Sequence, residues 1–158
     1  MADLLVRLYD LPPDGPVIAE LGRQGIVIRR AAASERFIVV DSARLHGSPG
    51  WAAECEVAFA RQPLACFVAV EGDALIGLAC YEATCRNFFG PELVHPERRG
   101  RGVGRALLLA ALHAMRAEGY GYAIIGWASA IDFYKRAVGA TLIEGSDPGI
   151  YPASRLSR

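Results

Sequence analysis

The sequence has little that would direct the protein to a metal, a membrane or a nucleic acid. Its cysteines form no Cys-x-x-Cys pair and have no histidine cluster near them, so we expect a reduced protein without a structural metal. The longest apolar run, Ala106 to Leu112, is far shorter than the ~20 residues that span a bilayer. Seventeen basic and seventeen acidic side chains cancel, which leaves no overall field to attract nucleic acid or an anionic membrane.

The opening MADLLVRLYD also lacks the apolar core of a signal peptide, because Asp3 and Arg7 interrupt it. We therefore expect a cytoplasmic protein with neither a membrane nor a nucleic-acid partner. The 158 residues suit one domain spanning 1–158, and the 53% hydrophobic content is too high for a disordered chain. Homodimers are common among soluble proteins, so a homodimer stays open.

Apolar segments alternate with turn signals in an order that predicts a mixed α/β fold with one sheet and helices on both faces. Strands are predicted at 4–8, 26–30, 66–70, 75–81, 88–94, 122–125 and 141–143. Helices are predicted at 34–45, 51–61, 102–118 and 129–138. Because Pro12–Pro16 is a strong turn signal, residues 1–24 are interpreted as an added edge strand and a turn. Residues 145–158 are interpreted as a turn-rich tail.

The most informative segment is the arginine-rich run from Arg98 to Arg105, in which three glycines stand at alternate positions ahead of an apolar helix. Glycines there let the backbone turn tightly and approach a ligand closely. The first N–H groups of a helix have no intrahelical partner, and the helix start carries roughly half a positive charge. The pattern predicts a site for a phosphate or diphosphate. A glycine-rich turn with solvated arginines is the alternative.

Two common phosphate loops do not match this run. A P-loop needs a lysine after its glycines, and the chain's one lysine, Lys135, lies far downstream. The dinucleotide fingerprint needs a third glycine where this chain has Arg105 or Leu107.

Arg99, Gly102 and Gly104 do match the pattern Gln/Arg-x-x-Gly-x-Gly/Ala. The surrounding segment LVHPERRGRGVGRALL resembles the strand–loop–helix of the GCN5-related N-acetyltransferases (the GNAT superfamily), and FYKRAVGATLI resembles that family's second signature. The resemblance covers roughly residues 26–145. It implies the GNAT-type fold, a single mixed and mostly antiparallel sheet flanked by helices.

The family resemblance also implies the activity. We expect acetyl transfer from acetyl-CoA, as co-substrate and without a metal, to a primary amine of a small molecule or peptide. A non-catalytic acyl-CoA-binding or regulatory module is the alternative. The acceptor amine and the acyl chain cannot be read from the sequence.

The resemblance implies a cofactor site with two parts. Backbone N–H groups of the loop would bind the diphosphate, with charge added by Arg99 and Arg101. The strand before the loop would diverge from its neighbour at Gly90-Pro91 and pair with the pantetheine arm. The predicted cofactor residues are Leu93, Val94, Arg99, Gly100, Arg101, Gly102, Val103, Gly104 and Arg105.

Two residues are predicted to carry catalysis. In the family, the tyrosine at the position of Tyr134 often protonates the departing thiolate, and a phenol is protonated at neutral pH. Glu92 is the candidate base for the amine, with Glu82 as an alternative. Trp127 stands where the family often has an asparagine, so it either walls the acceptor site or packs at a strand end. Trp51 and Phe59 are expected to pack in the core or at a hinge, with substrate contact as the alternative.

Overall fold

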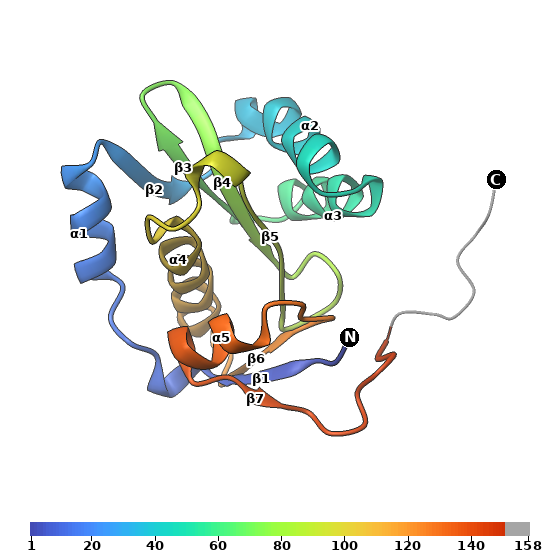
Figure 1. Cartoon of the computed structure of the whole chain (residues 1–158). Helices are drawn as coiled ribbons and strands as arrows, with labels where there is room; N and C mark the ends of the chain where they lie inside the picture. The colour runs from blue at the N-terminus through green and yellow to red at the C-terminus, as the bar shows by residue number, and fades with distance from the viewer. Residues whose placement is uncertain (151–158) are drawn as a thin grey trace.

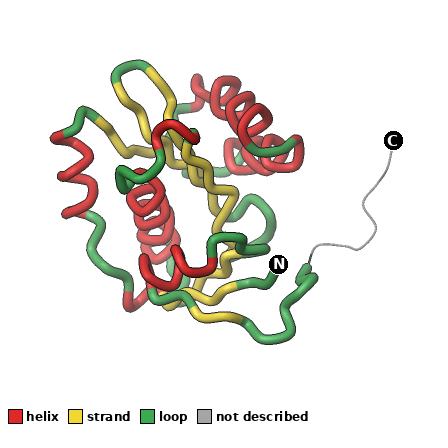
Figure 2. Tube along the Cα trace, viewed as in Figure 1, coloured by secondary structure: helices red, strands yellow, loops and turns green. Residues whose placement is uncertain are grey.

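The structure, a computed structural model, describes residues 1–150. A seven-stranded sheet runs through the middle of the molecule (Figures 1 and 2). The strand order is β2-β3-β4-β5-β6-β1-β7, and every neighbouring pair is antiparallel except β5–β6. This confirms the predicted single, mixed and mostly antiparallel sheet. The strands are β1 (Leu4–Arg7), β2 (Ile26–Arg30), β3 (Cys66–Glu71), β4 (Ala74–Tyr81), β5 (Phe88–Val94), β6 (Tyr122–Ile125) and β7 (Thr141–Leu142).

Helices cover both faces of the sheet, as the sequence predicts. One face carries α1 and α4, and the other carries the hairpin of α2 and α3 (Figure 1). The helix α5 lies beside the start of α4, where Phe133 faces Gly104. The helices are α1 (Gly15–Arg23), α2 (Arg36–His46), α3 (Pro49–Phe59), α4 (Val103–Ala117) and α5 (Ile131–Val138), with short 3-10 turns at Leu8–Asp10, Ala33–Glu35 and Pro96–Arg98.

The central helix α4 matches its prediction closely. Gly102 caps its start with a φ of 92°, a left-handed conformation that side chains disfavour. Its middle is buried on several sides because it packs across strands β2 to β6. Among the described residues, no helix has the length and apolarity needed to cross a membrane.

The first strand corrects one prediction. β1 was expected at the sheet edge, but it lies between β6 and β7 and pairs with both. Leu4 and Val6 are fully buried and belong to the hydrophobic core, and β7 pairs with the side of β1 that would otherwise be an edge. Residues 4–7 pair with residues 122–125, which are far away in the sequence, so no local pattern predicts the position of β1 inside the sheet.

The segment after β1 corrects a second prediction. Residues 1–24 were interpreted as a strand and a turn, but Gly15–Arg23 form α1. Pro16 sits at the first turn of this helix, where its missing N–H costs nothing, so the proline cluster starts a helix instead of excluding one. At the other end, residues 145–150 are turns and bends, as expected. The rest of the predicted tail, 151–158, lies outside the described residues.

Candidate active site

The sheet opens between β5 and β6. The two parallel strands pair only at Phe88 and Phe89, so β5 has no neighbour on that side from Gly90 onward. The sequence placed an opening at Gly90-Pro91, and the structure has it there. The N–H of His95 donates to Ile76 O at 3.0 Å. Because paired residues alternate along an antiparallel ladder, the backbone groups of Leu93 point to β4.

The same alternation turns the backbone groups of Glu92 and Val94 into the gap. The Val94 carbonyl already accepts a hydrogen bond from Arg99 Nε at 3.1 Å. The remaining groups offer a strand edge on which an extended amide-containing ligand can pair.

A loop of unpartnered backbone amides adjoins this edge. Within residues 1–150, no backbone or side-chain acceptor bonds the N–H groups of the six residues from Gly100 to Arg105. The next N–H along the chain, that of Ala106, donates to the Gly102 carbonyl. Such amides at a helix start form a cradle for an anion. The predicted diphosphate site therefore fits a phosphate-bearing ligand.

The arginines of the loop divide into two groups. Arg99 lines the cavity described below. Arg101 does not, because its guanidinium is bound to Glu71 at 2.9 Å and to Gln24 at 3.3 Å. Arg98 pairs with the same Glu71 at 2.8 Å. Because Arg98 and Arg101 share the single Glu71 carboxylate, the positive charge of the loop is partly balanced.

The gap and the cradle meet in a cavity of about 1170 Å³, slightly larger than the range of about 300–1,000 Å³ for ligand pockets. It brings together both predicted catalytic residues and part of the predicted cofactor set, namely Glu92, Tyr134, Leu93, Val94, Arg99, Val103 and Gly104. Gly100, Arg101, Gly102 and Arg105 are not on its wall, although their amides belong to the adjoining loop.

Tyr134 and Glu92 are in direct contact. The Tyr134 hydroxyl donates to Glu92 Oε2 at 3.1 Å, while Glu92 Oε1 is buried with no hydrogen-bond partner among the described residues. Burial raises the pKa of Glu92 to about 8, although the hydrogen bond from Tyr134 opposes the shift. Burial and the Glu92 carboxyl together raise the pKa of Tyr134 above its ordinary value. The phenol therefore stays protonated, and the carboxyl can exchange a proton near neutral pH.

The alternative base, Glu82, is not in this cavity. Its carboxylate pairs with Arg61 at 3.3 Å and accepts hydrogen bonds from the Tyr120 hydroxyl and the Asn87 N–H. These contacts tie three chain segments together, so Glu82 has a structural role. Among residues 1–150, no group of three or more His, Cys, Asp or Glu side chains is placed to hold a metal ion.

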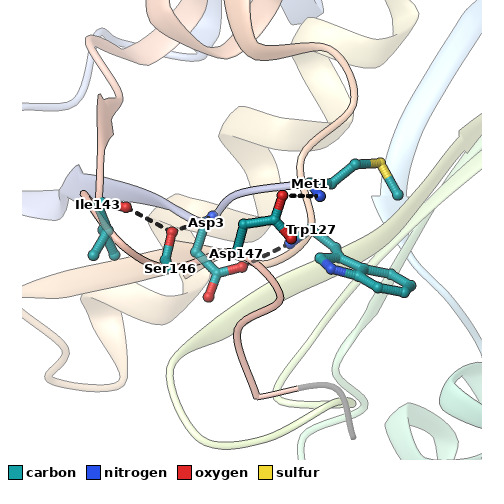
Figure 3. Close-up of polar contacts among 6 residues, drawn as sticks. All are labelled: Met1, Asp3, Trp127, Ile143, Ser146 and Asp147. Atoms are coloured by element: carbon teal, nitrogen blue, oxygen red, sulfur yellow. Dashed lines mark hydrogen bonds and ion pairs between the residues drawn. The ribbon is translucent and has the colours of Figure 1, made fainter. Parts of the chain in front are cut away.

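Trp127 is held on the cavity wall by the N-terminus (Figure 3). Its backbone has a φ of 50°, unusual for a bulky side chain. The buried Asp3 carboxylate accepts the Trp127 N–H at 2.8 Å, and Asp3 N–H donates to Ser146 Oγ at 2.8 Å. Met1 also lines the cavity, and its ammonium pairs with Asp147 at 2.9 Å. Trp127 therefore lies on the cavity wall just after the end of β6.

Two sequence expectations for nearby helices differ from the structure. Trp51, which is expected from the sequence to pack, is 36% exposed and lines the cavity. The helix predicted at 129–138 begins at Ile131, and Ala130 caps it without a side-chain hydrogen bond. Sequence reasoning missed Glu54 and His46 as cavity residues, since nothing local marks which face of the α2–α3 hairpin meets the gap.

A family model described as the acetyltransferase (GNAT) domain matches residues 62–137, which include the opened strand, the cradle and Tyr134. Over this stretch, nearly half of its length, the chain is similar to the GNAT family. No curated protein matches its sequence. The three solved structures described next are 16% to 19% identical to the chain and support the fold alone.

Three of these structures illustrate the likeness. One contains a glucosamine N-acetyltransferase region of a fungal multi-domain GH3 beta-N-acetylglucosaminidase, with 19% identity, a TM-score of 0.71 and coverage of 90% of this chain and 19% of that one. A GCN5-related N-acetyltransferase from Sphaerobacter thermophilus has 17% identity, a TM-score of 0.67 and coverage of 90% and 48%. An aminoglycoside acetyltransferase from a soil metagenomic sample, in complex with trehalose, has 16% identity, a TM-score of 0.53 and coverage of 72% and 88%. The chain thus spans less than half of the first two proteins.

Proposed function

We propose that the protein is an N-acetyltransferase that moves an acetyl group from acetyl-CoA to a primary amine of a small molecule or peptide. The observation that carries the proposal is the meeting of the amide cradle, the free edge of β5 and the Tyr134 hydroxyl at one cavity. Acetyl-CoA supplies the activated acyl thioester for this chemistry.

The residues of the chain divide the binding task. Amides of Gly100–Arg105 and the Arg99 guanidinium hold the diphosphate. The free backbone groups of Glu92 and Val94 align the pantetheine arm as an added strand would. One of these N–H groups facing the thioester oxygen would stabilise developing negative charge, a contribution of about 2.7–4 kcal/mol for a single such donor.

Two side chains handle protons. Tyr134 keeps its phenolic proton because its pKa is raised, so it can donate to the departing sulfur. An ordinary primary amine has a pKa near 10.4 and must lose a proton to attack. Glu92, with its pKa raised to about 8, is the carboxylate in the cavity whose basicity suits that task.

Thermal unfolding with acetyl-CoA, CoA or ATP added separately tests the proposal. A ligand at a hundred times its Kd adds about 2.7 kcal/mol of stability, so either CoA species should raise the Tm by several degrees and ATP should have a smaller effect. If neither CoA species shifts the Tm, both the transferase and the non-catalytic alternative are wrong.

A Tyr134→Phe variant separates those two functions. The substitution removes the hydroxyl at 3.1 Å from Glu92 and leaves the ring contacts with Phe89 and Phe133. For a transferase we expect kcat to fall about 10²-fold or more with unchanged acetyl-CoA affinity by calorimetry. Unchanged turnover would remove the hydroxyl from the mechanism.

A further inference from the structure

The cavity has a second end, away from the cradle. That end is formed by the α2–α3 hairpin, which covers the opposite face of the sheet from α4. Its wall includes His46, Trp51 and Glu54, with Thr84 contributed by the loop between β4 and β5. The proposed function assigns no role to this end.

Glu54 is the carboxylate at that end, and it lacks a cationic partner. Its Oε1 accepts a hydrogen bond from the Thr84 hydroxyl at 2.6 Å, which fixes the carboxylate in orientation. No Lys, Arg or His among the described residues lies within ion-pair distance of it. Glu56, two positions further along the same helix, is exposed and pairs with Arg36 at 3.3 Å. The unbalanced negative charge is therefore specific to the cavity side of α3.

Trp51 presents its indole at the same end. It lies one turn before Glu54 on α3, so the two side chains share a helix face. The ring packs over Gly47, where an added Cβ would come within 2.4 Å of its Cε3 atom. The absence of a side chain at Gly47 therefore positions the indole. A fixed carboxylate beside an aromatic face is a combination that binds an organic cation.

We propose that the acceptor is a small amine carrying a second positive charge, which Glu54 binds beside Trp51 while the first amine reacts near Tyr134. The inference rests on the proposed function. A reacting amine must be neutral to attack, so it cannot balance Glu54 during the reaction. The other basic groups on the cavity wall already have contacts. Arg99 donates to the Val94 carbonyl, the Met1 ammonium pairs with Asp147, and the His46 ring stacks on His95 at 4.2 Å. A second ammonium on the acceptor supplies the missing charge.

The test compares two probes of equal length, 1,5-diaminopentane and 1-aminopentane, on the full chain and on two variants. Glu54→Gln removes the charge and keeps an oxygen for Thr84, whereas Glu56→Gln makes the same change outside the cavity. A hydrogen-bonded charge pair corresponds to about a tenfold effect. We expect kcat/KM to favour the diamine about tenfold in the unmodified protein and in Glu56→Gln, with no preference in Glu54→Gln.

Binding gives a second readout. Calorimetric titration of 1,5-diaminopentane into the CoA-saturated protein should show affinity about tenfold weaker in Glu54→Gln than in Glu56→Gln. Equal affinities in the two variants, or no diamine binding at millimolar concentration, overturn the inference. A protein that binds CoA and acetylates both probes equally well keeps the transferase assignment and refutes the second charge. A protein whose Tm responds to no CoA species refutes the proposed function itself.

Discussion

The raised pKa of Glu92 makes the stability of the protein depend on pH in a defined direction. The carboxyl has a pKa of about 8 in the folded protein, mainly because burial disfavours its charged form, against an ordinary value of 4.5. Between these values the unfolded chain has lost a proton that the folded protein keeps. Stability contributed by the protonated carboxyl is therefore full below pH 4.5 and is lost as the pH rises toward 8.

Each pKa unit corresponds to about 1.36 kcal/mol, so titration of Glu92 from pH 5 to pH 8 should remove roughly 3 kcal/mol. Glu92→Gln abolishes the titration, because the amide is neutral and still offers Tyr134 an oxygen. We expect the free energy of unfolding of the variant, relative to the unmodified protein, to rise by roughly 3 kcal/mol across that range. Urea unfolding at pH 5, 6, 7 and 8, followed by tryptophan fluorescence, measures this difference.

Glu144→Gln is the matched control, because Glu144 is exposed and has no partner among the described residues. Its stability relative to the unmodified protein should stay nearly constant over the same pH range. A constant difference for Glu92→Gln as well, or one that grows toward low pH, would show that the carboxyl is ionised in the folded protein and refute the reasoning.

Two further substitutions test the supports of the site. Gly102→Ala places a Cβ at a φ of 92°, so we expect a loss of about 1 kcal/mol in unfolding free energy and weaker CoA binding by calorimetry. The control is Gly121→Ala, where an added Cβ meets open space. Equal stability and equal CoA binding in the two variants would contradict the argument. Asp3→Ala leaves the Trp127 N–H without its acceptor, so we expect a loss of about 1–3 kcal/mol and a higher KM for the amine with little change for acetyl-CoA. An unchanged amine KM would mean that Trp127 does not shape the acceptor end.

The parts of the molecule that could be predicted from sequence are those with local causes. The helix α4 has an apolar repeat and a glycine at its start, and β6 is a short β-branched run whose observed bounds equal the predicted ones. The opening of β5 follows from Gly90-Pro91, since a proline cannot donate to a ladder. The amide cradle follows from the position of the glycines at a helix start.

The parts that could not be predicted depend on residues far apart in the chain. Glu71 binds Arg98 and Arg101 from thirty or so positions away, so no local pattern shows that the loop's charge is partly balanced. Thr84, in the loop between β4 and β5, bonds Glu54 of α3, and Asp3 bonds Trp127 over most of the length of the chain. Such contacts form only in the folded chain, so no local sequence pattern indicates them.

The position of β1 connects these long-range contacts to the site. Had β1 been an edge strand, its first residues could fray without affecting the cavity. Because it lies between β6 and β7 instead, its first residues are locked to the chain on both sides: Ala2 O accepts the N–H of Ala128, and Asp3 O accepts the N–H of Ile143. Met1 and Trp127 are thereby placed together on the cavity wall (Figure 3). The N-terminus, which lies outside the stretch that resembles the family, thus shapes part of the cavity wall.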